Sequence, residues 1–476
     1  MTKRLFSINF IIFLLFSTNT FSQVEFETII GEQYDEQVST IVNADNNSYI
    51  ISITSFPPGQ YSSSKLTKIS SDGEVILQKD LAKPDTASLI NTIISSYTDN
   101  GYFAIGKLHC NDKKWLWMLE FDNDFNIISE NKFLLLEDIT RIGRMKVVKK
   151  NFKYYIAYYS YIPNHVWPIT KLCMFNPEDN SYTSSEWSIY GFIWNLVDNP
   201  NNENLLLSGH LDYRDSRFLM YEINYQLEIV ELHNSFEHDI YHMTDCKWYN
   251  NNKLIHTGSC IYSEHEDTRF MAIQTLDSNF NAINFKTFGV LDVYNYAASY
   301  NSIAIADNMI YYGGTRDVVF NSFPETNNYL PVIKLDSDLN KEWTMLLGGD
   351  AYYIMSTICP TEEGGCVIAG TRFDSNTQNH ECDVYIAKLD PNCVTNTGTL
   401  ELSANISLYP NPGNSIINIE TEENIFTFEL YDAMGKRVLQ SQNQKTINVN
   451  NINSGIYFYR FIKNNTVQHI GKWIKE

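Results

Sequence analysis

The chain has 476 residues, of which 43% are hydrophobic and 14% aromatic, and its formal net charge is −21. This length allows two to four average domains, or one large repeat domain with smaller ones beside it. The acidic balance argues against a nucleic-acid partner, which requires a basic face, and the 31 Tyr and 27 Phe residues favour β-structure.

The first 22 residues have the pattern of a secretory signal peptide. Lys3 and Arg4 precede an apolar run over residues 5–16, and residues 20–22 (Thr-Phe-Ser) place small side chains before a cleavage site at Gln23. This run is too short to span a bilayer, and no other stretch approaches 18 apolar residues. We therefore expect an exported chain without a transmembrane segment in its mature form.

Eight cysteines are an even number, which permits disulfides in an exported chain. Three local pairings are open, and they are Cys246 with Cys260, Cys359 with Cys366, and Cys382 with Cys393. Cys173 lies within an apolar strand and fits a buried free thiol equally well. Spacing alone cannot fix the connectivity, so the disulfides stay unassigned.

The middle of the chain, residues 24–395, repeats one pattern seven times at intervals of about 50 residues. Each unit has a polar turn, a first apolar strand, a polar loop and a second apolar strand. The first strands cover residues 49–54, 102–106, 154–158, 205–209, 254–258, 310–314 and 366–370. The second strands cover residues 66–69, 116–122, 171–175, 218–223, 270–277, 332–336 and 385–390.

Four short strands in about 50 residues match one blade of a β-propeller. The seventh unit ends near Cys393 without an outer strand of its own, whereas residues 26–31 resemble residues 285–289, the outer strand of unit five. The N-terminal strand is therefore expected to complete the last blade and close the ring. We predict an all-β chain with a seven-bladed β-propeller over residues 23–393, the alternative being a run of unrelated hairpins.

Two segments of the repeat region contain residues that could bind a metal. His238 and His242 have a spacing that would suit zinc on a helix, but their surroundings predict a loop entering a strand. The acidic loop over residues 263–267 offers three carboxylates to Ca²⁺, although a solvated loop explains it better. We assign no metal and no other cofactor, and keep calcium at this loop as the alternative.

Asp/Asn turns such as residues 122–124, 277–279 and 336–338 lack the Gly and the distal Glu of a calcium loop. Because they recur at the same place in successive units, they predict hairpin turns.

Six tryptophans could stack on sugar rings. They are Trp115, Trp117, Trp167, Trp187, Trp194 and Trp248. Trp117 and Trp248 lie in or beside repeat strands and are expected in the core, which leaves Trp167, next to Pro168 in a long loop, as the best candidate. The chain has no nucleophile or phosphate-binding motif. Catalytic residues stay unassigned, although a propeller can bring two distant carboxylates together at its axis.

Residues 394–403 are polar and read as a linker, and residues 404–476 show short alternating strands of a small β-sandwich. Four motifs occur in order in this tail, at residues 408–412 (Leu-Tyr-Pro-Asn-Pro), 430–436, 454–457 and 471–474. Their marked positions are Tyr409, Pro410, Asn411, Pro412, Asp432, Gly435, Gly455, Tyr457 and Gly471. Gly435 and Gly455 fit turns that need positive φ.

This pattern resembles the C-terminal sorting domain (type A) of the type IX secretion system, found in the Bacteroidetes. The resemblance implies a small immunoglobulin-like sandwich that the outer-membrane secretion machinery recognises. It also implies export through the periplasm and outer membrane, to the cell surface or out of the cell.

Three functions stay open for the propeller. It can be a binding scaffold for a protein or glycan, a secreted glycan hydrolase with carboxylates at the propeller axis, or a structural module of the cell envelope. The missing catalytic motifs favour the first, and fold alone does not decide between them.

Overall fold

The structure is a computed structural model of the whole chain. It describes residues 24–32, 34–98, 101–135, 141–163, 167–210, 218–233, 240–262, 265–290, 293–319, 326–376, 381–392, 407–421, 425–432, 436–463 and 466–475. Contacts divide the chain into two units, Met1–Val394 and Thr395–Glu476. The expected signal peptide and the expected linker lie outside the described residues.

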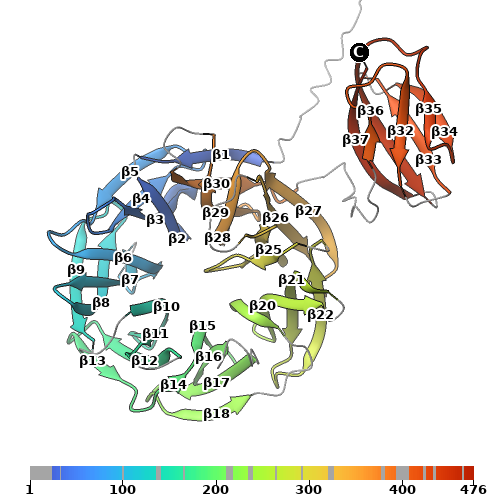
Figure 1. Ribbon diagram of the computed structural model, residues 1–476. Helices are drawn as coiled ribbons and strands as arrows, with labels where there is room; N and C mark the ends of the chain where they lie inside the picture. Colours follow the sequence, from blue (N-terminus) through green and yellow to red (C-terminus); the bar gives the residue numbers. More distant parts are fainter. Residues whose placement is uncertain are drawn as a thin grey trace, which may run out of the picture. The chain divides into compact units, whose positions relative to one another are not determined.

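The first unit is a seven-bladed β-propeller, as predicted (Figure 1). Its described residues form seven antiparallel sheets, which we number as blades 1 to 7 in chain order. The innermost strands are β2 (Asp35–Asn43), β6 (Ala87–Ser95), β10 (Arg141–Lys150), β15 (Phe192–Asp198), β19 (Tyr241–Tyr249), β24 (Ile303–Ala306) and β28 (Tyr352–Pro360). In blade 6, β23 (Asn295–Ala297) pairs with the same second strand as β24.

The remaining strands of each blade follow outward in order. The second strands are β3 (Tyr49–Phe56), β7 (Gly101–Cys110), β11 (Lys153–Tyr161), β16 (Asn204–His210), β20 (Lys253–Tyr262), β25 (Met309–Arg316) and β29 (Cys366–Phe373). The third strands are β4 (Ser63–Ile69), β8 (Lys113–Asp122), β12 (Ile169–Asn176), β17 (Phe218–Asn224), β21 (His265–Leu276), β26 (Tyr329–Leu335) and β30 (Cys382–Leu389).

The outer strands are β5 (Val75–Asp80), β9 (Ile127–Leu134), β13 (Ser181–Ser184), β18 (Ile229–His233), β22 (Ala282–Phe288), β27 (Lys341–Gly348) and β1 (Val24–Ile30). A short β14 (Ile189–Tyr190) also pairs with β12, and a 3-10 turn, η1 (Asp45–Asn47), follows β2. The repeat pattern in the sequence therefore marked the second and third strands of each blade and passed over the innermost ones.

The ring closes as expected, because β1 pairs antiparallel with β30 along Val24–Leu389 to Ile30–Val384. Lys388 of β30 strengthens this seam by an ion pair with Glu25 at 2.8 Å. The closure protects the edge of blade 7, which would otherwise be free to pair with another chain.

Buried apolar side chains from adjacent blades form the cores between them. One such cluster joins blades 2 and 3, where the rings of Phe103 and Tyr154 stack at 3.7 Å between centroids. Strands β3 and β7 are buried on both faces, which explains why they read as continuous apolar runs.

The recurring acidic turns are hairpin turns, as predicted. Asp122 Oδ1 accepts the backbone N–H groups of Asp124 at 3.0 Å and Asn126 at 2.8 Å, and Asp277 and Asp336 repeat this arrangement. The side-chain hydrogen bond from Asn126 contributes most to lowering the pKa of the Asp122 carboxyl. These carboxylates stabilise turns, so no metal is needed to account for them.

Two of the three cysteine pairings that the sequence left open, Cys246 with Cys260 and Cys359 with Cys366, are not formed. Cys246, Cys260 and Cys359 carry free thiols. Cys246 lies opposite His256 and Cys359 lies opposite Val367 in their ladders, so neither faces its proposed partner. Cys382 is also free, and Cys393 lies outside the described residues.

The second unit is a small two-sheet β-structure. One sheet contains β31 (Ser407–Tyr409), β32 (Ile416–Glu420) and β35 (Thr446–Asn448). The other contains β34 (Arg437–Gln442), β33 (Thr427–Tyr431), β36 (Gly455–Lys463) and β37 (Thr466–Lys475). Residues such as Phe428, Phe461 and Trp473 are buried in its core. Among the described residues of the whole chain, no helix is long and apolar enough to cross a membrane.

Candidate ligand site at the propeller axis

Six of the seven innermost strands carry an irregularity in their pairing, and β24 of blade 6 is the regular one. The pairing registers shift between Val38 and Thr40 in β2, and between Ile193 and Asn195 in β15, with similar shifts in β6, β10, β19 and β28. A β-bulge inserts a residue and re-aims its side chain. The irregular strands contribute polar residues near the axis. A search of the sequence for apolar runs does not detect these residues.

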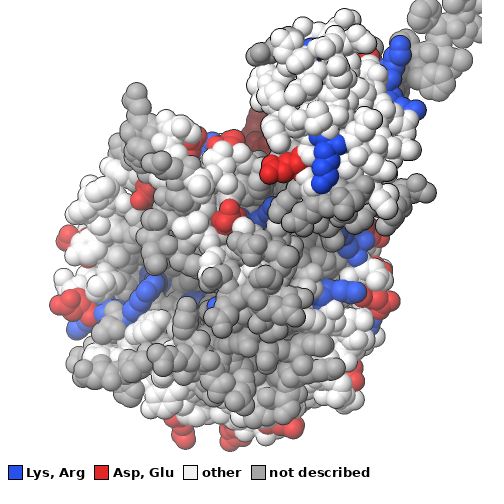
Figure 2. All heavy atoms as spheres, turned by 45° about the vertical axis from the view of Figure 1, so that its right-hand side comes forward, with Lys and Arg blue, Asp and Glu red and all other residues white. Residues whose placement is uncertain are grey.

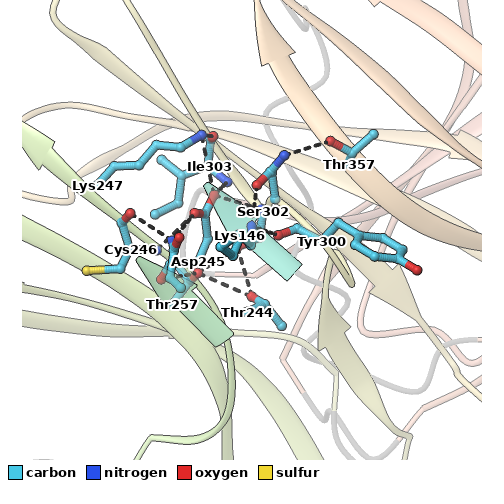
Figure 3. A network of polar contacts seen from close by, with 12 residues as sticks. Lys146, Thr244, Asp245, Cys246, Lys247, Thr257, Tyr300, Ser302, Ile303 and Thr357 are labelled. Atoms are coloured by element: carbon cyan, nitrogen blue, oxygen red, sulfur yellow. Dashed lines mark hydrogen bonds and ion pairs between the residues drawn. The ribbon is translucent and has the colours of Figure 1, made fainter. Parts of the chain in front are cut away.

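Asp245 of β19 is the centre of the polar network in Figure 3. Its Oδ1 accepts from Asn195 Nδ2 at 2.8 Å and from the Cys246 backbone N–H at 2.9 Å. Its Oδ2 accepts the N–H groups of Ser302 at 3.1 Å and Ile303 at 3.0 Å. The side chain is buried, and both oxygens are occupied, so Asp245 joins blades 4, 5 and 6.

Lys146 of β10 crosses the axis to a blade that does not adjoin its own (Figure 3). Its Nζ donates to the Tyr300 carbonyl and to Asn301 Oδ1, both at 2.7 Å, in the segment between β23 and β24 of blade 6. Burial lowers the pKa of Lys146 to about 7, and the neighbouring charges of Arg144 and Lys247 oppose its protonation while Asp245 favours it. Lys146 therefore connects blades 3 and 6 across the ring, and it is only partly protonated at neutral pH.

Arg144 lies two residues before Lys146 in β10 and has a different environment. Its guanidinium carbon is 4.5 Å from the Trp194 ring centroid and 5.0 Å from the Tyr300 ring centroid, over both rings. It makes no hydrogen bond to the described residues, and its Nη1 is buried without a partner. Burial also lowers the pKa of Arg144. A buried guanidinium nitrogen without a hydrogen-bond partner is costly, and an anion that accepts from it would offset that cost.

A cleft of about 230 Å³ opens between blades 1, 2 and 3. Its basic lining comprises Lys107, His109, Lys114 and Arg141, and its apolar lining comprises Phe56, Leu89, Leu108 and Ile142. Lys107 Nζ donates to the Ile142 carbonyl at 2.8 Å, and burial, followed by the charge of Arg141, lowers the pKa of Lys107 to about 8.

The cleft and Arg144 belong to one electrostatic region. Burial raises the pKa of Tyr300, and the charges of both Arg144 and Arg141 oppose that rise, so both guanidiniums act on the same phenol. We call Lys107, Arg141, Arg144 and Lys146 the axial basic cluster. Its positive charge contrasts with the chain's net charge of −21, and Figure 2 shows both acidic and basic side chains at the margins of the propeller.

The tryptophans chosen from the sequence lie in different environments. Trp117 is buried and donates to Glu130 at 2.8 Å, as expected of a core residue, and Trp248 is partly buried. Trp115 lines a second cleft of about 260 Å³, where Lys132 lies over its ring. Trp167, the favoured candidate, is half-buried in its loop, and no described contact makes it part of a site. Trp194 is the one that the fold brings to the axial basic cluster.

The metal candidates from the sequence cannot be placed. His238 and loop residues 263–264 lie outside the described residues, as do the side chains of His242 and residues 265–267. In the described part of blade 4, Glu222, Glu231 and His233 bring three ligand atoms within 4.8 Å of one another. Glu222 already accepts from Asn204 Nδ2 at 2.9 Å, and we assign no metal to this group.

Sequence reasoning missed the axial basic cluster, although one signal was present. Residues 141–150 contain two arginines and three lysines in a strongly acidic chain, and three of the four residues of the axial basic cluster come from that stretch. Arg144 and Lys146 are two apart in a strand, so they share a face. Both contact Tyr300 of blade 6, which lies more than 150 residues later in the chain. No local sequence pattern predicts that contact.

In the second unit, the Tyr-Pro-Asn-Pro motif holds the last strand. The Trp473 indole donates to the Pro410 carbonyl at 2.9 Å, and the Ile474 N–H donates to Asn411 Oδ1 at 3.0 Å. Both peptide bonds before Pro410 and Pro412 are cis.

The other marked positions lie in turns and strands of the same unit. Tyr409 ends β31 and is exposed, whereas Tyr457 is buried against Trp473. Asp432 accepts the Lys436 N–H at 2.9 Å, and Gly471 pairs with Tyr459. Gly455 begins β36 and has a positive φ of 159°, as expected from the sequence, and Gly435 lies outside the described residues.

Residues 407–476 match the family model of the secretion system C-terminal sorting domain. The chain therefore carries a type IX sorting domain, which directs export to the cell surface or secretion. No curated protein matches the chain in sequence.

Solved structures that resemble the chain share little sequence with it. A fungal alcohol oxidase of the AA5 family in complex with copper is 11% identical with a TM-score of 0.48, covering 94% of this chain and 98% of that one. The Dos1 propeller is 11% identical with a TM-score of 0.39 and coverages of 74% and 77%. The β-propeller domain of the Trilobed protease from Pyrococcus furiosus is 11% identical with a TM-score of 0.38 and coverages of 75% and 98%.

Proposed function

We propose that the propeller is an exported binding module that holds an anionic ligand at the axial basic cluster. The observation that carries this proposal is Arg144, whose buried Nη1 has no partner while its guanidinium lies over Trp194 and Tyr300. Lys107 and Arg141 line the neighbouring cleft, and Arg141 lies three residues before Arg144 in β10, so the cleft adds positive charge to the cluster. Anions recognised by such groups gain strong, charge-assisted hydrogen bonds.

The alternative of a glycan hydrolase with carboxylates at the axis has less support. Such an enzyme needs two carboxyl groups that are free to exchange protons or attack the sugar. In the described axial network the carboxylate is Asp245, and its oxygens are occupied by donors from three blades. That arrangement favours a structural role for Asp245.

Binding of the full-length protein to immobilised anionic polymers tests the proposal. We expect retention on polygalacturonate, dextran sulfate or polyglutamate, but not on neutral dextran. Replacing both Lys107 and Arg141 with Ala should weaken retention at least about tenfold. The matched control replaces Lys286 and Lys341, which lie on the outer strands β22 and β27, and it should behave like the wild type.

The proposal fails if no anionic polymer is retained better than neutral dextran. It also fails if the Lys107/Arg141 variant binds as well as the outer-strand control.

A further inference from the structure

The surroundings of Arg144 specify more than a negative charge, provided that the axial basic cluster is a ligand site as proposed above. The rings of Trp194 and Tyr300 engage the face of the guanidinium. A guanidinium carries its N–H donors in its own plane, so the donors that remain open point edgewise. The ligand group that meets such an edge best is planar and accepts two parallel hydrogen bonds, which describes a carboxylate.

The charge around Arg144 also favours a group with one negative charge. Asp245 and Lys247 lie 3.4 Å apart as an ion pair and largely offset each other. Lys146 donates to two oxygens of blade 6 and is only partly charged near neutral pH. Immediately around the Arg144 guanidinium, its own charge is therefore the main one to neutralise, which matches a carboxylate better than a dianionic phosphate.

Aromatic rings beside Arg144 provide an apolar wall suited to a sugar. The Trp194 ring stacks with Phe192 at 6.2 Å and with His210 at 5.4 Å, and Phe192 contacts Tyr159 at 5.3 Å. The Trp194 N–H is already bonded to His210 Nδ1, which fixes the orientation of the ring. Arg144 covers the Trp194 ring, so the sugar would pack on the neighbouring rings of Phe192 and Tyr159, and because these rings are held in place their ordering costs little entropy.

A second cationic position is present in the neighbouring cleft. Lys107 and Arg141 are set among the apolar side chains of Leu89, Leu108 and Ile142, and the cleft measures about 230 Å³. This repeats the combination found at Arg144, a cation next to an apolar wall. A chain of sugars with regularly spaced carboxylates would satisfy both positions.

We propose that the axial basic cluster binds an acidic saccharide whose units carry carboxylates. One carboxylate lies on the Arg144 edge beside Trp194, and a neighbouring one lies between Lys107 and Arg141. The carboxylate-bearing sugar is thus the chemical class of ligand for this propeller.

The first test leaves the protein unchanged and varies the ligand. Isothermal titration calorimetry of the full-length protein compares oligogalacturonates with their methyl esters, which keep the sugar rings but lose the charge. We expect the esters to bind at least about tenfold more weakly. Dextran sulfate and polyglutamate are the comparison anions, and both should bind more weakly than the oligogalacturonate at equal charge concentration.

The second test changes Arg144. The substitution Arg144→Lys keeps a positive charge but removes the planar pair of donors, and it should weaken oligogalacturonate binding at least about tenfold. The control is Arg316→Lys, because Arg316 also lies over a ring, that of Tyr329, outside the axial basic cluster. Near-ultraviolet circular dichroism of each variant shows whether the aromatic packing is kept.

The outcomes separate this inference from the broader proposal. If esters bind as well as acids, or if Arg144→Lys binds as well as Arg316→Lys, carboxylate recognition at Arg144 is overturned. If sulfated polymer or polyglutamate binds as tightly as the oligogalacturonate, the site recognises charge alone; the inference fails while the binding module stands. If no anion binds at all, both fail together.

Discussion

Glu36 sits at the junction between blade 1 and blade 7, and its carboxyl group should make the propeller's stability depend on pH. The side chain is 2% exposed. Its Oε2 accepts the Glu32 N–H at 3.2 Å, and its Oε1 accepts the Ser55 hydroxyl at 3.3 Å. Burial, assisted by the charges of Glu32 and Asp383, raises the pKa of Glu36 from 4.5 to about 7.

The sign and size of this pH dependence follow from proton linkage. Between pH 4.5 and pH 7 the folded protein holds a proton on Glu36 that the unfolded chain has released. Stability from this group is therefore fully present below about pH 4.5 and is lost as the pH rises toward 7. A pKa difference of this size between the folded and unfolded protein corresponds to about 3 kcal/mol in the free energy of unfolding.

The substitution Glu36→Gln removes the titration and keeps the shape. The variant should be more stable than the wild type by about 2–3 kcal/mol at pH 8, and the difference should vanish near pH 4.5. Urea unfolding of both proteins at pH 4.5, 6 and 8, followed by tryptophan fluorescence, measures it. Glu74→Gln, at an exposed turn position of the same blade, is the matched control. A stability difference that does not change with pH, or a Gln variant less stable than the wild type at pH 8, would refute the reasoning.

Four further outcomes are expected. Asp245→Ala should cost about 3–5 kcal/mol in urea unfolding, because four donors and Lys247 lose a buried partner; an effect below about 1 kcal/mol would contradict the network. Deleting Val24–Ile30 should expose β30 and produce oligomers on size-exclusion chromatography, whereas a monodisperse monomer would argue against the seam. The Cys359 thiol, whose pKa burial raises to about 12, should resist iodoacetamide at pH 8 until urea unfolds the protein, and rapid labelling of the native protein would disprove its burial. Asn411→Ala should leave the Ile474 N–H unpaired, lowering the stability of the tail by about 1–2 kcal/mol and the secreted fraction seen by immunoblot; unchanged secretion would show that this contact is dispensable.

Much of the fold could be predicted because its strands are simple in sequence. Strands β3 and β7 are apolar on both faces and stand out as runs, and the similarity of residues 26–31 to an outer strand revealed the closure. The innermost strands stayed hidden because they mix polar and apolar residues around a bulge, as Asp35–Asn43 does.

The candidate site was harder to predict from the sequence than the fold. Trp194 was among the aromatic candidates, but the position of Trp167 in a long loop next to Pro168 made that residue the preferred one. Arg144 and Lys146 became informative only when the ring brought Tyr300 against them, since contacts across an axis depend on the count and order of the blades. The alternative of paired acids at the axis followed from the ability of a propeller to bring distant residues together there, whereas the described acidic turns lie at hairpins between third and outer strands.

The seam between β1 and β30 also sets an order of events in folding. Strand β1 is made before every other strand of the propeller, yet its partner begins at Cys382, so it must wait while six blades form. Joining residues this far apart costs about 3 kcal/mol more in loop entropy than closing a hairpin of about ten residues. Until then β1 is a bare strand, and its Glu25 and Glu27 discourage it from pairing with another chain. The final pairing is therefore a slow, long-range step, and the ring behaves as a single cooperative unit only after it is complete.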